Sequence, residues 1–322
     1  MQQTHLGTRP LGRTGLEITG VGFGAWAIGG GGREFGWGPQ EDDESIAAIG
    51  RALELGVNWI DTAAAYGFGR SERIVGRALQ GGAERPYVFT KCSLLDDGTG
   101  HVRHSLERDS ILREAEASLQ RLGIDAIDLY QIHWPIPAED IDEGWAAMAT
   151  LKERGLVRHI GVSNFDAGQL RRIQAIAPVE TIQPPYSLID RAAEAEILPR
   201  AETDGIGVIV YSPMGSGLLT GAITRERIEA MPADDWRKTD PRFTEPQLSR
   251  HLALAGRLRA VADRHGTTPG AVAVAWTLHN PAVDGAITGF RRPAQVEEIL
   301  AAADLELTDE DLTDIEAAAR AN

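Results

Sequence analysis

The chain has 322 residues, with 32 Lys and Arg against 47 Asp and Glu, so its formal net charge is −15. Nucleic-acid and anionic membrane surfaces both require a local excess of cations, and this composition favours neither partner. Hydrophobic residues make up 43% of the chain and charged residues 25%, which is typical of a folded globular protein rather than of a disordered one.

The cysteine content and the lack of long apolar stretches narrow the setting further. Cys92 is the only cysteine, which excludes an intramolecular disulfide and an all-cysteine metal site. The first fifteen residues lack the apolar segment of a signal peptide, and no run of 18 apolar residues occurs. We therefore expect a cytoplasmic protein without a membrane segment, while the sequence leaves open whether it is a monomer or a homo-oligomer.

Short apolar runs alternate with longer amphipathic segments along the chain. Each run is nearly continuous in apolar residues, as in the strands of a parallel sheet that is buried on both faces. We predict strands over residues 21–29, 58–61, 87–91, 126–133, 159–164, 181–187, 207–213 and 284–289.

The segments between these runs carry apolar residues at helical spacing together with signals for helix ends. Pro269 is suited to a first helical turn, and Thr308 with Asp311 three residues later forms a weak capping box. We predict helices over residues 44–56, 111–123, 267–280 and 307–320.

The alternation amounts to eight strand–helix units without a Pro-rich or Ser-rich linker. This organisation predicts one domain over residues 1–322 with an α/β fold, a (β/α)8 TIM barrel, rather than a doubly wound open sheet. Ahead of the first strand, Thr14-Gly15 marks the turn of a short β-hairpin. After the seventh strand, an irregular loop from Gly221 to about Pro246 is long enough to be a functional lid.

Polar side chains follow the predicted strands at the point where each one ends. Because the carboxyl ends of barrel strands meet at one face, these side chains are expected to share a pocket. They are Asp61, Lys91, His133, Ser163, Asn164, Gln183, Tyr211, Ser212 and, after Gly289, Arg291.

Four of the polar residues near this face form a chemically coherent set: Asp61, Tyr66, Lys91 and His133. A phenol is a poor acid at neutral pH, but a nearby ammonium lowers its pKa, and a carboxylate can keep that ammonium charged. Each residue alone could be structural. Together they predict Tyr66 as proton donor to a carbonyl oxygen, with His133 orienting the carbonyl or sharing the proton transfer.

The motifs around these residues carry a family resemblance. NWIDTAAAYG, VFTK, DLYQIHWP, RHIGVSNF, YSPMGSGLLTG and ITGFRRPAQVEEIL occur in order between about Leu11 and Ala302. They resemble the aldo-keto reductase superfamily, in particular the bacterial branch with the inositol-operon and general-stress reductases, and are similar to the potassium-channel β subunits. The resemblance implies a (β/α)8 barrel, NADP(H) without a metal, and reversible hydride transfer between nicotinamide and a carbonyl. It also implies Tyr66 as general acid, Lys91 and Asp61 as its tuning pair, and His133 as the carbonyl-orienting residue.

The resemblance also assigns cofactor positions one at a time. Those beside the nicotinamide are Gly24, Ala25, Trp26, Asp61, Ser163, Asn164, Gln183 and Tyr211. Those around the pyrophosphate, where glycines let backbone N–H groups approach, are Ser212, Pro213, Met214, Gly215, Ser216 and Gly217. Those at the adenosine end, beside a helix N-terminus, are Gly289, Arg291, Gln295 and Glu298.

Two positions depart from the family pattern, which often has a lysine at Ala222 and an asparagine at Ile299. Arg291, Arg292 and, from the predicted lid, Arg237 could compensate on a 2′-phosphate. The sequence therefore favours NADPH, with NADH as the alternative.

Other motifs have simpler interpretations. The G-x-G-x-x-A match at residues 22–27 lacks a following helix, because Gly29 to Gly32 would not begin one. His101 and His104 are interpreted as a solvated pair in a free loop, Cys92 as inert core, and residues 41–44 as the first turn of a helix. Substrate-pocket candidates, each with a core position as the alternative, are Trp26, Trp37 and Trp134.

The leading hypothesis is a reductase of aldehydes and ketones, or a dehydrogenase of the matching alcohol or sugar. One alternative is a Schiff-base aldolase that uses Lys91, although Asp61 would oppose the low lysine pKa that this chemistry needs. A second alternative is an NADPH-binding redox sensor with little turnover. The sequence does not identify the substrate.

Overall fold

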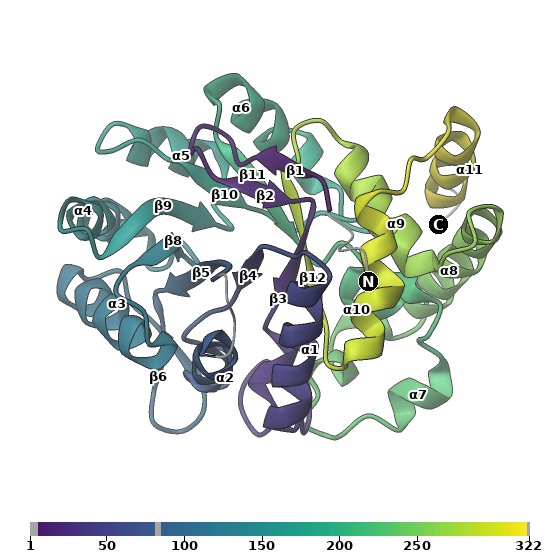
Figure 1. Ribbon diagram of the computed structural model, residues 1–322, viewed down its shortest axis with the longest axis horizontal. Helices are drawn as coiled ribbons and strands as arrows, with labels where there is room; N and C mark the ends of the chain where they lie inside the picture. The colour runs from purple at the N-terminus through teal and green to yellow at the C-terminus, as the bar shows by residue number, and fades with distance from the viewer. Residues whose placement is uncertain (1–5, 81–84, 321–322) are drawn as a thin grey trace.

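Parallel strands close into a barrel in the computed structural model, which describes residues 6–80 and 85–320 (Figure 1). Each strand pairs with its neighbour in parallel, and the last returns to the first. In barrel order the strands are β3 (Val21–Gly24), β4 (Trp59–Asp61), β5 (Tyr87–Cys92), β8 (Ile127–Ile132), β9 (Val157–Ser163), β10 (Thr181–Gln183), β11 (Gly207–Tyr211) and β12 (Gly285–Gly289). The predicted (β/α)8 barrel is confirmed, with several strands shorter than expected.

Helices surround the barrel, and residues predicted to begin or end helices do so. Gly123 ends α3 in the left-handed conformation, with φ 67°, and Thr308 and Asp311 exchange hydrogen bonds at the start of α11. The helices are α1 (Asp42–Glu54), α2 (Arg70–Leu79), α3 (Arg108–Leu122), α4 (Ile141–Glu153), α5 (Ala167–Gln174), α6 (Ile197–Asp204), α7 (Arg225–Glu229), α8 (Gln247–Arg264), α9 (Pro269–His279), α10 (Pro293–Leu300) and α11 (Asp309–Arg320).

The predicted hairpin is also present and closes one end of the barrel. Strand β1 (Thr8–Pro10) pairs with β2 (Glu17–Thr19) in antiparallel fashion. Below it, the Trp59 indole fills the barrel interior and donates a hydrogen bond to the Thr19 carbonyl at 2.8 Å. The hydrophobic cluster here joins hairpin and barrel residues: Leu11, Leu16, Ile18, Trp59, Phe89, Leu129, Ile209 and Ile287. Polar chemistry is therefore confined to the opposite end.

The segment after β11 is more ordered than predicted. Instead of an irregular loop, residues 221–246 contain α7 and two single 3-10 turns, Trp236–Lys238 and Pro241–Phe243. Their apolar side chains form a small core with residues outside the segment: Leu218, Ile223, Met231, Phe243 and Leu248. Short helical turns satisfy the backbone polar groups that an irregular loop would leave to water. We call residues 221–246 the lid.

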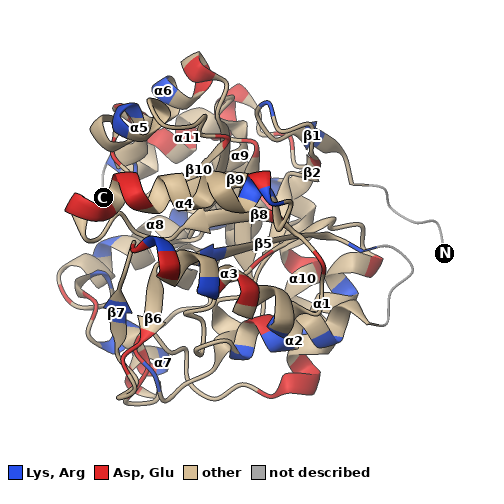
Figure 2. Ribbon diagram, turned by 90° about the vertical axis from the view of Figure 1, so that its left-hand side faces the viewer, with Lys and Arg blue, Asp and Glu red and all other residues tan. Residues whose placement is uncertain are grey.

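A second hairpin was not predicted. Strand β6 (Leu94–Asp96) pairs with β7 (Val102–His104) at the same end of the barrel as α7, opposite the β1–β2 hairpin (Figures 1 and 2). His104 therefore belongs to a strand rather than to a free loop, and its Nδ1 is buried without a hydrogen-bond partner among the described residues. His101 lies near Glu34 instead, with 3.6 Å between Nδ1 and the carboxylate.

The structure agrees with the remaining minor predictions. The G-x-G-x-x-A stretch leads into a short 3-10 turn, Ala27–Gly29, and not into an α-helix. Cys92 is buried, and its thiol lies 3.8 Å from the Met148 sulfur.

Charged residues of both signs lie along the outer helices (Figure 2). No helix among residues 6–80 and 85–320 is long and apolar enough to cross a membrane. The first five residues of the stretch inspected for a signal peptide lie outside the described residues.

Candidate active site

The four predicted catalytic residues come together at the open end of the barrel. Asp61 ends β4, Tyr66 lies in the turn after it, Lys91 lies near the end of β5, and His133 follows β8. The Lys91 ammonium donates to Asp61 Oδ1 at 2.5 Å and to Tyr66 Oη at 3.3 Å. The His133 ring meets the Tyr66 ring edge-on, with 5.7 Å between ring centres.

The ammonium of Lys91 is fully engaged in this arrangement. Its third hydrogen bond goes to the carbonyl oxygen of Thr62 at 2.9 Å, so each of its N–H groups has an acceptor. Asp61 is held from the other side by the Gln183 amide, whose Nε2 donates to Oδ2 at 2.9 Å. The carboxylate thus joins the lysine to the end of β10 across the barrel.

Burial dominates the proton affinities at the site. Burial and the neighbouring Asp61 raise the pKa of Tyr66 well above its usual value, although a lowered pKa was expected from Lys91. The sequence-based expectation considered the ammonium but not the loss of water around the phenol. Burial, together with Lys91 and His104, holds the pKa of His133 well below 6.5, so its imidazole is neutral at neutral pH.

The residues predicted beside the nicotinamide form a continuous polar network. Tyr211 Oη donates to Asn164 Oδ1 at 2.8 Å, and the Asn164 amide donates to the carbonyl of His133 at 2.9 Å. Ser163 Oγ donates to the carbonyl of Gln183 at 2.8 Å. Asn164 adopts a left-handed backbone with φ 63°, which turns its amide toward β8. These contacts join the ends of β8, β9, β10 and β11.

Two further positions of this group lie directly beside Asp61. Gly24 pairs with Asp61 in the barrel sheet, and the next residue, Ala25, donates its N–H to the Asp61 carbonyl at 2.8 Å. Trp26 is partly exposed and continues the same segment toward the barrel mouth.

The segment predicted around a pyrophosphate has an unusual backbone. Ser212, Gly215, Ser216 and Gly217 all have positive φ angles between 56° and 100°. Alternating right- and left-handed residues can turn N–H groups toward an anion, but the N–H groups of Gly215 and Gly217 already donate to the carbonyls of Ser212 and Met214. The hydroxyl of Ser216 is buried and has no hydrogen-bond partner among the described residues. Pro213 and Met214 complete this segment between β11 and the 3-10 turn Gly215–Thr220.

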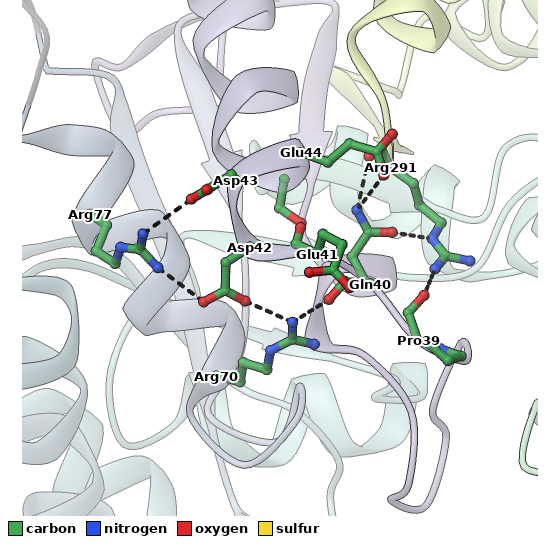
Figure 3. Close-up of polar contacts among 10 residues, drawn as sticks. Pro39, Gln40, Glu41, Asp42, Asp43, Glu44, Arg70, Arg77 and Arg291 are labelled. Carbon is green, nitrogen blue, oxygen red and sulfur yellow. Dashed lines mark hydrogen bonds and ion pairs between the residues drawn. The ribbon is translucent and has the colours of Figure 1, made fainter.

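The adenosine end is open at Gly289 but not at Arg291. A Cβ built on Gly289 would meet no atom of residues 6–80 and 85–320 within 4 Å, so the backbone is accessible there. The guanidinium of Arg291 instead binds the segment before α1 (Figure 3), where it donates to Gln40 Oε1 at 2.6 Å and to the carbonyls of Trp37 and Pro39. Part of the hydrogen-bonding capacity assigned to a phosphate is therefore already used.

The other residues predicted at the adenosine end lie in or just before helix α10. Gln295 accepts hydrogen bonds from the N–H groups of Arg291 and Arg292, so it caps the start of its own helix. Glu298 and Arg292 are exposed. Ile299 is buried, so an apolar side chain suits that position.

The acidic residues before and within the first turn of α1 have a structural role, as predicted. Asp42 binds Arg70 at 2.7 Å and Arg77 at 2.9 Å, and Asp43 lies 3.4 Å from Arg77 (Figure 3). These pairs attach α1 to α2 beside the segment that Arg291 holds.

An aromatic cluster lies over the barrel mouth. Trp26 stacks on Trp236 of the lid, with 5.3 Å between ring centres and 14° between planes. The Tyr66 ring lies 6.1 Å from the Trp26 ring, with 24° between their planes. Trp37 meets the Trp26 ring edge-on. Trp134, 39% exposed, makes no aromatic contact with this cluster in the part of the chain that the structure describes. Two of the three predicted pocket tryptophans are thus brought together.

Comparison with known proteins identifies the family. The sequence pattern described as "Aldo/keto reductase family" matches residues 20–320. This chain belongs to the aldo/keto reductase family. Aldo-keto reductase YhdN of Bacillus subtilis (strain 168) is 41% identical over 305 residues, which cover 94% of this chain and 90% of that protein. A NADH-specific methylglyoxal reductase of Escherichia coli (strain K12) is 36% identical, over 94% of this chain and 95% of that protein.

The fold of this aldo/keto reductase is also that of solved structures. The structure of the glycerol dehydrogenase AKR11B4 from Gluconobacter oxydans superposes with a TM-score of 0.87 at 37% identity, covering 99% of this chain and 95% of that one. The sequence-based resemblance and the predicted fold are both confirmed.

Several residues at the site were not predicted from the sequence. Two of them, Asp235 and Trp236, lie directly before Arg237 in the lid. Only Arg237 was noticed in the sequence, because its positive charge suggested phosphate binding. Thr62 contributes a backbone carbonyl, and Gln40 lies far along the chain from Arg291. Motif spacing cannot indicate such contacts, because they depend on how the lid and the segment before α1 fold.

Proposed function

We propose that this aldo/keto reductase transfers a hydride between a nicotinamide dinucleotide and a small carbonyl compound, with Tyr66 as proton donor. The observation that carries the proposal is the position of Lys91, whose ammonium joins Asp61 to the Tyr66 hydroxyl at the open end of the barrel. An oriented phenol beside a fixed cation is an arrangement that protonates an oxygen as negative charge develops on it.

The residues present fit the dinucleotide, because the positive-φ run after β11, the unpartnered Ser216 hydroxyl and the open backbone at Gly289 offer it contacts. When bound, the cofactor supplies the hydride that adds to the carbonyl carbon. Ser163, Asn164 and Gln183 would hold the nicotinamide amide.

The protein side of the reaction follows from the proton affinities. Burial keeps Tyr66 protonated until the carbonyl oxygen becomes an alkoxide, which then takes the phenolic proton and leaves as an alcohol. The Lys91 ammonium, 3.3 Å from Oη, stabilises the phenolate that remains. Neutral His133 can donate one N–H to the same carbonyl oxygen and hold it toward Tyr66.

For the cofactor we propose NADP(H), with NADH also accepted. The exposed Arg292 supports the phosphorylated form, and Arg237 and Arg291 add positive charge although Asp235 and Gln40 already bind them. The relative named as NADH-specific supports the other form. Tryptophan-fluorescence titration with NADPH and NADH separately tests this choice. Binding of NADH alone would contradict it.

The aldolase alternative receives less support. Burial lowers the pKa of Lys91, as this chemistry needs, although Asp61 raises it as expected. Lys91 must also turn a lone pair toward a carbonyl, but all three N–H groups already have acceptors. Borohydride reduction with a carbonyl substrate should therefore leave no adduct on Lys91. A trapped adduct would support the aldolase.

The substrate is proposed to be a small carbonyl, polyol or sugar that enters beside Trp26, Trp37 and Trp134. The names of two relatives, for methylglyoxal and glycerol, make these compounds the first to screen. We further propose that residues 1–322 act as one domain, and that the protein works in the cytoplasm without nucleic-acid, membrane or metal partners.

The decisive test is Tyr66→Phe. We expect it to remove most carbonyl reduction, at least a hundredfold in kcat, while cofactor Kd stays within about twofold, because only the proton donor is lost. Tyr87→Phe is the matched control, since Tyr87 begins β5 at the far end of the barrel. Unchanged turnover in Tyr66→Phe would refute the mechanism, and little turnover in the parent protein would favour the redox-sensor alternative.

A further inference from the structure

The lid arginine assigned to a phosphate is already bound to a carboxylate. Arg237 Nε donates to Asp235 Oδ1 at 2.9 Å and its terminal nitrogen donates to Oδ2 at 2.5 Å, a bidentate pair. Only 10% of the Arg237 side chain and 1% of the Asp235 side chain are exposed. The guanidinium also lies over the Trp37 ring, 4.3 Å from its centre.

This pair belongs to a larger group of charges at the proposed adenosine end. Burial lowers the pKa of Arg291, Arg237 and Arg292 lower it further, and Asp235 and Glu44 raise it, so all four charged groups lie close enough to act on Arg291. Three cations face two anions, and Asp235 is the anion bonded directly to one of the arginines. Removing its charge would double the net positive charge of the group.

NADPH and NADH differ here only by a phosphate that carries about −1.5 to −2 charges. The Asp235 carboxylate already holds two N–H groups of the Arg237 guanidinium, neutralises its charge and repels a phosphate that approaches it. NADH brings no such charge and does not require Arg237 to leave its partner. The carboxylate therefore weakens binding of one nucleotide and leaves the other unaffected.

We infer that Asp235 is a specificity-determining residue that reduces the preference of this enzyme for NADPH over NADH. The inference rests on the proposed function, because it requires the 2′-phosphate to lie near Arg237. Asp235 acts as a built-in competitor for the phosphate site.

The lid contains a second Asp-x-Arg pair that serves as a matched control. Asp240 accepts from the N–H of Arg242 at 2.8 Å and from its guanidinium at 3.0 and 2.8 Å, the same geometry as in Asp235 and Arg237. Arg242 stands over Trp236, and its side chain is more exposed. In both pairs an asparagine keeps the side-chain oxygen that caps the 3-10 turn while removing the charge.

The experiment measures Kd for NADPH and for NADH by tryptophan fluorescence in the parent protein, Asp235→Asn, Asp240→Asn and the double variant Asp235→Asn/Arg237→Met. We expect Asp235→Asn to tighten NADPH binding about tenfold and to change NADH binding less than twofold. Asp240→Asn should leave the ratio of the two Kd values unchanged. The double variant should not bind NADPH more tightly than the parent protein, because it lacks the Arg237 guanidinium that Asp235→Asn makes available.

Other outcomes overturn the inference. Weaker NADPH binding in Asp235→Asn would mean that the carboxylate positions Arg237 for the phosphate instead of competing with it. Equal changes for both nucleotides, or the same change in Asp240→Asn, would mean that the lid as a whole has altered. If the parent protein bound neither nucleotide, the proposed function would fail and the inference with it, which separates that failure from the others.

Discussion

Glu114 provides a measurable test of the buried electrostatics beneath the site. Its carboxylate, on the inner face of α3, accepts hydrogen bonds from the Ser93 N–H at 2.9 Å and from the Ser110 hydroxyl at 3.0 Å. Burial nevertheless raises its pKa from 4.5 to about 7. Between these pH values the folded protein holds a proton that the unfolded chain has released, so stability falls as the pH rises.

The shift corresponds to a loss of about 3 kcal/mol of unfolding free energy between pH 4.5 and well above pH 7. Glu114→Gln removes this loss, because a glutamine can accept from Ser93 and donate to the Ser110 hydroxyl without a charge. We expect the variant to match the parent protein near pH 4.5 and to exceed it by up to about 3 kcal/mol at pH 8.5.

Urea unfolding across this pH range measures the difference directly. Glu116→Gln, an exposed glutamate on the same helix, is the control and should follow the parent protein at every pH. If the curves of Glu114→Gln and the parent protein run parallel from pH 4.5 to 8.5, the carboxylate is not held protonated and the reasoning fails.

Two further predictions concern the barrel and its lid. Gly22→Ala should lower stability by about 1–3 kcal/mol, because a Cβ there would overlap the Trp59 ring. Gly50→Ala should raise it by about 0.5–1 kcal/mol, because a Cβ there would meet no atom of the described residues within 4 Å. Equal Tm values for the two variants would contradict this. Trp236→Ala should raise the KM for carbonyl substrates about fivefold through loss of its stacking on Trp26, and steady-state kinetics with an unchanged KM would refute the assignment of Trp236 to the pocket.

The fold was predictable because its determinants are local. Apolar runs such as the one ending at Asp61 mark strands, and Thr308 with Asp311 marks a helix start by hydrogen bonds across three residues. The proximity of the four candidate catalytic residues was predictable for the same reason, since barrel topology makes polar residues at strand ends into neighbours. The contact of Lys91 with Tyr66 is a consequence of that topology.

The outer part of the candidate site was predicted less well. Arg237 and Arg291 were assigned to a phosphate, but Asp235 and Gln40 bind them. Gln40 comes from a segment far along the chain from Arg291, which no local pattern reveals, whereas Asp235 lies only two residues before Arg237 and its charge was not considered. The pKa of Tyr66 was misjudged in a similar way, because its burial depends on the complete site and not on the identity of its neighbours.

The β1–β2 hairpin has a consequence for the order of events in catalysis. Ile18 and Trp59 belong to the cluster that fills one end of the barrel, so the proposed cofactor and substrate would both have to bind at the other end. If they overlap there, we expect the one that lies deeper to bind first and leave last. Product-inhibition kinetics would show this order, and random binding would contradict it.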